Sequence, residues 1–97
     1  MERVSYHRLA RRELNEAAQY YESESSGLGE AFLDEVERCT HGAANFPEAA
    51  PLITKTIRRR LVPRFPYALL YSIKPDSVRV LAVMNLKRRP MYWVGRE

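Results

Sequence analysis

The hydrophobic period of this sequence changes once, near Pro51, and that change limits the folds that the chain can adopt. Before Pro51, apolar residues recur at helical spacing in two stretches that the turn sequence SSGLG separates. After Pro51, apolar residues alternate with other residues, which is the period of a β-strand. A chain of 97 residues with this pattern is expected to be one α+β domain that spans residues 1–97.

Each helical stretch carries one apolar stripe and ends at residues that interrupt helices. Gly27 and Gly29 permit the positive φ of a turn, so the first helix is expected to end near them. Pro47 and Pro51 end the second helix. Two helices joined by so short a turn form an antiparallel hairpin. The stripes are Ala10, Leu14, Ala17, Ala18 and Tyr21 in the first helix, and Leu28, Phe32, Val36, Cys39 and Ala43 in the second.

Four segments have the pattern of strands. RVSY at residues 3–6 is one, and KTIRRRLV, YALLYSI and VRVLAVMNL follow Pro51. The expected order is therefore β-α-α-β-β-β, with the N-terminal helical hairpin packed on one face of a small antiparallel sheet. Apolar residues on the other face have no remaining segment to cover them, which predicts a protein partner there. In the last strand, alternation places Val78, Val80, Ala82, Met84 and Leu86 on one face.

Charge is divided unevenly between the two halves of the chain. Residues 1–49 hold five Lys/Arg and ten Asp/Glu, whereas residues 50–97 hold eleven Lys/Arg and two Asp/Glu. The second half therefore has a net charge of +9, which predicts a polyanionic partner, either nucleic acid or an acidic protein. A solvated basic face without a dedicated partner is the alternative.

Several classes of protein are excluded by what the sequence lacks. It contains no G-x-x-x-x-G-K-[ST] and no G-x-G-x-x-G nucleotide-binding loop. Cys39 is the only cysteine, so neither an internal disulfide nor a four-cysteine zinc site can form. No apolar stretch is long enough to span a bilayer, and the N-terminus lacks the apolar core of a signal peptide. We expect a cytoplasmic protein that uses no cofactor, no metal and no membrane.

Two groups of cations remain as the residues with the greatest functional potential, and neighbouring strands would bring them together. Guanidinium groups bind phosphate and carboxylate, and they stabilise the charge that develops as RNA is cleaved. Tyr92 or Trp93 would stack on a base. A nuclease, a nucleic-acid binder and a receptor for an acidic protein all remain open. The groups are Arg58, Arg59, Arg60 and Arg64, and Lys87, Arg88, Arg89 and Arg96.

Three segments taken together resemble one protein family. They are A-x-x-E-L-x-x-A-x-x-Y from Ala10 to Tyr20, RFPYALLYSI from Arg64 to Ile73, and VLAVMNLKRRPMYWVGR from Val80 to Arg96. With the β-α-α-β-β-β order, they resemble the RelE/ParE superfamily, the toxins of bacterial type II toxin–antitoxin systems. The resemblance implies a RelE/ParE-like fold and a growth-inhibiting toxin that a cognate antitoxin neutralises.

Two activities occur in this superfamily, and the residue at position 68 of this chain helps to choose between them. RelE-like members cut mRNA in the ribosomal A site, whereas ParE-like members poison DNA gyrase. The nuclease branch has an arginine in the strand motif Y-R-L-x-Y, where this chain has Ala68. Loss of one such donor should lower the cleavage rate by about 10²–10³-fold, which favours the ParE-like branch and a protein that is not an enzyme. The alternatives are a ribosome-dependent mRNA endonuclease that uses Arg58, Arg60, Arg88 and Tyr92, and a non-toxic RNA-binding module.

The resemblance also implies two sets of contact residues. The basic C-terminal end is expected to contact the target. For Trp93 the alternative is that its side chain packs over the helix pair as part of the core. The implied partners are an acidic ParD-like or RelB-like antitoxin, DNA gyrase or alternatively the ribosome with mRNA, and operator DNA only through the antitoxin. The expected target-binding residues are Arg88, Arg89, Tyr92, Trp93 and Arg96, and the expected antitoxin-binding residues are Arg58, Arg60, Leu70, Arg79 and Leu81.

Overall fold

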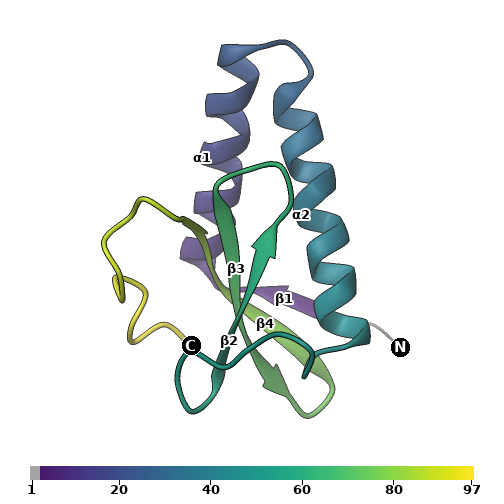
Figure 1. Cartoon of the computed structure of the whole chain (residues 1–97), viewed down its shortest axis with the longest axis vertical. Coiled ribbons are helices and arrows are strands. Elements are labelled where there is room, and N and C mark those ends of the chain that lie inside the picture. Colours follow the sequence, from purple (N-terminus) through teal and green to yellow (C-terminus); the bar gives the residue numbers. More distant parts are fainter. Residues whose placement is uncertain (1–2) are drawn as a thin grey trace.

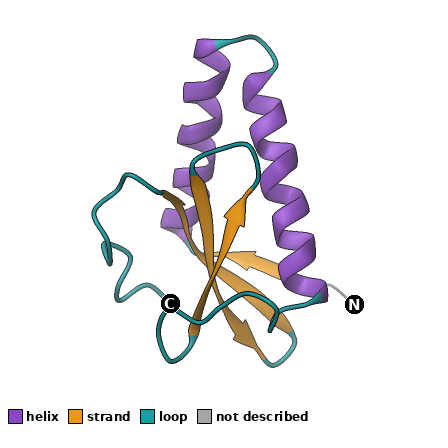
Figure 2. Cartoon of the chain, in the orientation of Figure 1, coloured by secondary structure: helices purple, strands orange, loops and turns teal. Residues whose placement is uncertain are grey.

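The fold is a helical hairpin packed on a four-stranded sheet (Figure 1). The computed structural model describes residues 3–97. Figure 2 shows the two helices running side by side, joined by a short loop. The β-α-α-β-β-β order and the α+β class expected from the sequence are confirmed. The elements are β1 (Val4–Tyr6), α1 (Arg8–Glu24), α2 (Leu28–Asn45), β2 (Ile57–Val62), β3 (Tyr67–Lys74) and β4 (Ser77–Asn85).

The helical hairpin buries the two apolar stripes that its sequence predicts. His7 caps α1, because its Nδ1 accepts a hydrogen bond from the Leu9 N–H at 3.0 Å. Gly27 supplies the left-handed turn, with φ at 86°. Gly29, expected in the same turn, instead lies within α2, where a Cβ would sit 2.5 Å from the Ala18 carbonyl oxygen. The absence of a side chain at Gly29 therefore lets α1 and α2 approach closely.

The sheet is mixed, whereas the sequence suggested an antiparallel one. Its strand order is β1-β4-β3-β2, and β2, β3 and β4 pair antiparallel. The N-terminal strand β1 pairs parallel with β4, with Val4 opposite Val78 and Tyr6 opposite Val80. This pairing joins the first strand of the chain to the last. Local alternation of apolar residues does not indicate whether two strands so far apart in sequence run parallel or antiparallel.

A β-bulge in β4 changes which residues face the helices. Leu81 is left as an extra residue between the pairs Leu70–Ala82 and Tyr71–Val80. Val80 packs in the core beneath the helices, whereas Ala82 lies with Leu70 on the opposite face. One inserted residue reverses the alternation beyond it, so the expectation of a single continuous face was wrong. The residues assigned to that face were Val78, Val80, Ala82, Met84 and Leu86.

The main core lies between the helices and the sheet and is rich in aromatic rings. Phe32 and Phe65 meet edge to face with 5.1 Å between ring centroids, and Tyr21 and Tyr67 join the same cluster. Within residues 3–97, no helix combines the length and the apolar character that crossing a bilayer requires.

Candidate functional site

Residues 86–97, called here the C-terminal segment, follow β4, and Figure 1 shows them looping out to one side of the sheet and returning beside it. Trp93 is 3% exposed and packs with Leu70 and Ala82 on the face opposite the helices. The expectation that this face is uncovered was therefore wrong at its centre, where the chain itself covers Leu70 and Ala82. Trp93 is a core residue, on the other side of the sheet from the helix pair.

Two residues expected to bind the antitoxin belong to the core in this structure. Leu70 is 0% exposed and lies beneath Trp93, and Leu81, the bulge residue, is 3% exposed. A partner cannot contact either side chain in this conformation. Both positions are therefore corrected from surface contacts to core residues, because the sequence pattern could not show that the C-terminal segment folds back.

Arg96 anchors the C-terminal segment through an ion pair with Glu13 of α1. Its Nη1 and Nη2 lie 3.0 Å from Oε1 and Oε2 of the carboxylate, and the two side chains are only 12% and 13% exposed. Arg96 Nη1 also donates to the Leu81 carbonyl at 3.0 Å. The Val83 N–H donates to Glu13 Oε1 at 3.0 Å. This bidentate pair therefore fixes the segment to both α1 and β4.

Tyr92 is held between two guanidinium groups. The Cζ of Arg88 lies 4.1 Å from its ring centroid and that of Arg96 lies 5.1 Å away. Its hydroxyl is buried beside the Glu13 carboxylate, although no hydrogen bond of good geometry joins it to any residue among 3–97. Burial, followed by the negative charge of Glu13, raises the pKa of Tyr92 far above its usual value. Tyr92 is therefore a neutral packing element between the buried anchor and the exposed cation.

The outward side of the C-terminal segment presents cations next to apolar side chains. Lys87, Arg88 and Arg89 are exposed, and Met91 and Val94 are 53% and 62% exposed. Met91 has a φ of 68°, the left-handed conformation that helps to turn the segment. Sequence reasoning missed Met91 and Val94, because a segment without regular period does not show which side chains point outward.

The structure does not bring the β2 arginines to the C-terminal segment. Strand β3 lies between β2 and β4, and Arg58 points to the helix side, where it donates to the Glu48 and Ala50 carbonyls at 3.1 and 2.7 Å. Arg60 lies against Gly42 of α2. The expectation that neighbouring strands unite the two cation groups was wrong. The set Arg58, Arg60, Arg88 and Tyr92, assigned to the nuclease alternative, does not converge on one site.

Arg79 of β4 is also engaged within the chain. Its Nη1 donates to Ser5 Oγ at 3.1 Å, and its Nε donates to the main-chain oxygen of Glu97 at 2.8 Å. Arg79 therefore ties the last residue of the chain to the β1–β4 edge. It remains partly exposed and keeps surface on which a partner can bind.

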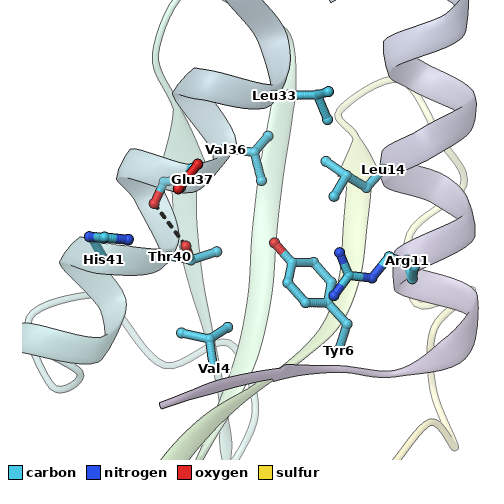
Figure 3. A pocket seen from close by; sticks show the side chains of 9 residues that line it. All are labelled: Val4, Tyr6, Arg11, Leu14, Leu33, Val36, Glu37, Thr40 and His41. Atoms are coloured by element: carbon cyan, nitrogen blue, oxygen red, sulfur yellow. Dashed lines mark hydrogen bonds between the residues drawn. The ribbon is translucent and has the colours of Figure 1, made fainter. Parts of the chain in front are cut away.

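A hollow of about 390 Å³ lies between the two helices and β1 (Figure 3). Figure 3 shows Tyr6 and Arg11 side by side at its floor, and the Arg11 Cζ lies 4.2 Å from the Tyr6 ring centroid. Burial raises the pKa of Tyr6, and the positive charge of Arg11 partly opposes that effect. The mixed apolar and charged walls suit a protein side chain. The lining residues include Leu14, Leu33, Val36 and Glu37.

Cys39 and His7 have structural roles. Burial raises the pKa of the Cys39 thiol, which therefore stays protonated, and its Sγ lies 3.4 Å from the Leu61 carbonyl oxygen. His7 is used as the α1 cap. In the part of the chain that the structure describes, no three His, Cys, Asp or Glu side chains cluster as metal ligands would.

The family model of the ParE toxin of the type II toxin–antitoxin system parDE matches residues 4–90. This chain belongs to the ParE toxin family. Among solved structures, the chromosomal ParDE toxin–antitoxin system from P. aeruginosa is similar, with a TM-score of 0.61 and 15% identity. The similarity covers 88% of this chain and 96% of that chain, and at this identity it shows a shared fold. No curated protein matches the chain.

As a ParE-family member, the chain is the toxin component of a type II toxin–antitoxin system, with a cognate antitoxin as its partner. The family and the ParE-like branch expected from the sequence are confirmed. The family match ends at residue 90, before Tyr92, Trp93 and Arg96. The roles of these three residues therefore rest on the geometry of this chain, in which two of them anchor the segment and one packs between cations.

Proposed function

We propose that this ParE-family toxin acts in the cytoplasm and stops growth by poisoning DNA gyrase through the outward side of its C-terminal segment. The observation that carries the proposal is a cationic, partly apolar surface on a fixed support. Arg88 and Arg89 are exposed beside Met91, while Trp93 and Arg96 are buried beneath them. Arginine and methionine are enriched at protein interfaces, so this composition suits a protein target.

This arrangement reduces the set of target-binding residues that the sequence led us to expect. Arg88 and Arg89 remain proposed contacts, and Met91 and Val94 join them because both are exposed. Trp93 and the Arg96 guanidinium do not contact the target themselves in this proposal. They support binding by holding the C-terminal segment in place.

The nuclease alternative has less structural support. Ala68 is 0% exposed in β3, so the strand offers no phosphate-binding group at the position of the arginine in the nuclease branch. The arginines of β2 that would replace it point to the helix side of the sheet. An RNA-binding module would need phosphate contacts along one continuous surface, whereas these cations are divided between two faces.

The test uses the purified chain in two parallel reactions. One contains DNA gyrase and plasmid, and the other contains ribosomes programmed with mRNA. We expect cleaved or unsupercoiled plasmid to accumulate in the first reaction and the mRNA to stay intact in the second. Cleavage of ribosome-bound mRNA without any effect on gyrase would overturn the proposal in favour of the endonuclease.

We also propose that the antitoxin is acidic and binds operator DNA on behalf of the complex. Charge supports the acidity of the antitoxin, because the half of this chain from residue 50 onward carries eleven Lys/Arg and two Asp/Glu. An acidic partner would neutralise this excess, and electrostatic attraction would speed its association. The rate of complex formation is expected to fall as salt concentration rises.

A further inference from the structure

Tyr20 is an exposed aromatic residue on the helix that holds the C-terminal segment. It is 58% exposed, and its ring meets that of Tyr21 edge to face with 5.3 Å between centroids. Tyr21 in turn packs against Phe32 and Phe65 of the core. The Tyr20 ring is therefore accessible and also held in place, which lowers the entropy that a contact with a partner would cost.

A hollow of about 170 Å³ joins Tyr20 to the C-terminal segment. Helix α1, the start of β3 and the end of β4 line it together with Arg88. Figure 1 shows α1 on the side of the molecule to which the segment loops out. Glu13, which also lines the hollow, pairs with Arg96 at 3.0 Å. Tyr20 and the outward cations of the segment therefore belong to one continuous surface with fixed relative positions.

Acidic side chains flank Tyr20 along α1. Glu16 and Glu24 lie one helical turn to either side of it on the same face, and both are exposed. Glu16 is only loosely paired, at 3.9 Å from Arg12, and Glu24 forms no ion pair with any residue from 3 to 97. A cation over the face of Tyr20 would be attracted by the ring and by both carboxylates.

The charge on the other side of the hollow has the opposite sign, because Lys87, Arg88 and Arg89 are exposed there. An acidic antitoxin segment would be repelled by Glu16 and Glu24, and so would the phosphates of a nucleic acid. A protein surface that carries a basic side chain next to acidic ones matches both sides of the hollow. The distribution of charge therefore favours a protein target at this position.

We propose that Tyr20 binds a basic side chain of the target protein, an arginine or a lysine, over its ring and between Glu16 and Glu24. Arg88 and Arg89 meet acidic side chains beside it, so the target-binding surface continues from the C-terminal segment onto α1. The inference deepens the proposed function and rests on it, because it takes the outward side of the C-terminal segment as the side that faces the target.

Tyr20→Ala is the first test, with purified DNA gyrase and plasmid as the probe. The toxin concentration for half-inhibition should rise at least about tenfold, whereas Tyr20→Phe keeps an aromatic face and should stay within about threefold of wild type. The matched control is Phe46→Ala, at the 68% exposed C-cap of α2, which should change the value less than about twofold. Equal half-inhibitory concentrations for wild type and Tyr20→Ala would overturn the inference.

Reversal of charge distinguishes a protein from DNA as the occupant. Glu16→Lys/Glu24→Lys should weaken inhibition at least about tenfold. Glu30→Lys/Asp34→Lys makes the same change in charge at exposed positions of α2 and should alter inhibition less than about threefold. Stronger inhibition by the α1 variant would place DNA at Tyr20 and overturn the inference. Circular dichroism checks folding, and a tenfold loss of antitoxin affinity in Tyr20→Ala would reassign Tyr20 to the antitoxin.

Growth inhibition in cells separates this inference from the choice of gyrase as the target. If gyrase is unaffected but Tyr20→Ala loses the growth inhibition that Phe46→Ala retains, the proposed target is wrong and the Tyr20 contact stands. If wild type and Tyr20→Ala stop growth equally well, the contact is wrong whatever the target. Sedimentation of a toxin dimer that Tyr20→Ala abolishes would also overturn the inference, because a second copy would then occupy Tyr20.

Discussion

Arg96 and Glu13 lie 83 positions apart in the sequence and meet in a bidentate ion pair with both contacts at 3.0 Å. The same carboxylate accepts from the Val83 N–H, so one acid joins α1, β4 and the C-terminal segment. Trp93, three residues before Arg96, fills the sheet face below. The outward cations of the segment are therefore positioned by a largely buried acid in the second turn of the first helix.

Glu13→Gln should destabilise the fold, because it leaves the Arg96 guanidinium buried without a countercharge. We expect a loss of about 2–3 kcal/mol, below the range for a fully buried pair because both side chains keep some exposure. The matched control is Glu16→Gln, whose partner Arg12 lies 3.9 Å away with both side chains more than half exposed. It should cost less than about 0.5 kcal/mol in urea unfolding. Equal losses in the two variants would show that the buried pair has no special role.

Trp93→Ala should remove the packing that holds the C-terminal segment on the sheet. The expected loss is about 3–5 kcal/mol, whereas Val94→Ala, at a 62% exposed position, should change stability by less than about 0.5 kcal/mol. Trp93 is the only tryptophan, so its fluorescence reports this site directly. In the folded protein the emission should be that of a buried indole and should shift to the red on unfolding. Emission typical of a solvated indole before unfolding would contradict the placement of Trp93.

The double variant Arg88→Ala/Arg89→Ala should lower toxicity without unfolding the domain. Both residues are exposed on the C-terminal segment, so gyrase inhibition is expected to fall about tenfold or more. Arg88 also stacks on Tyr92, which adds at most about 1 kcal/mol to stability at an exposed site. Lys55→Ala/Lys74→Ala removes the same charge from exposed positions outside the segment and should inhibit like wild type. Circular dichroism checks that both variants fold, and equal toxicity would contradict the assignment of the target surface.

Tyr92→Phe should change the dependence of stability on pH. Burial raises the pKa of Tyr92 in the folded state, so above about pH 10 the unfolded chain loses a proton that the folded chain retains. The stabilisation is present below that pH and is lost as pH rises. The urea midpoint should therefore fall more between pH 9 and pH 11 in wild type than in the variant. A residual fall is expected, because burial also raises the pKa values of Tyr6, Tyr21 and Tyr71.

At neutral pH the same variant should be as stable as wild type or more stable. The Tyr92 hydroxyl is buried beside the Glu13 carboxylate without a well-formed hydrogen bond in the described chain, and a buried hydroxyl that lacks such a bond costs about 1–3 kcal/mol. A clear loss of stability in Tyr92→Phe at pH 7 would show instead that the hydroxyl forms a bond in solution.

The sequence by itself determined the helices and the order of the elements. The stripes from Ala10 to Tyr21 and from Leu28 to Ala43 are buried as their spacing predicts, because helical periodicity is set by neighbours within a few residues. The change of period near Pro51 likewise located the three later strands. Motifs along most of the chain were sufficient to indicate the ParE-like family.

The tertiary structure decided which side chains the sheet and the C-terminal segment expose. One extra residue at Leu81 reversed the alternation of β4, and alternation gives no signal where an insertion will occur. Trp93, Leu70 and Arg96 all looked like contact residues because aromatic, apolar and cationic side chains are common at interfaces. Each is instead buried by a partner remote in sequence. Such contacts form between residues far apart in sequence, and their free energy includes the entropy lost when the intervening chain is closed into a loop. A local sequence pattern does not indicate which distant residues will meet.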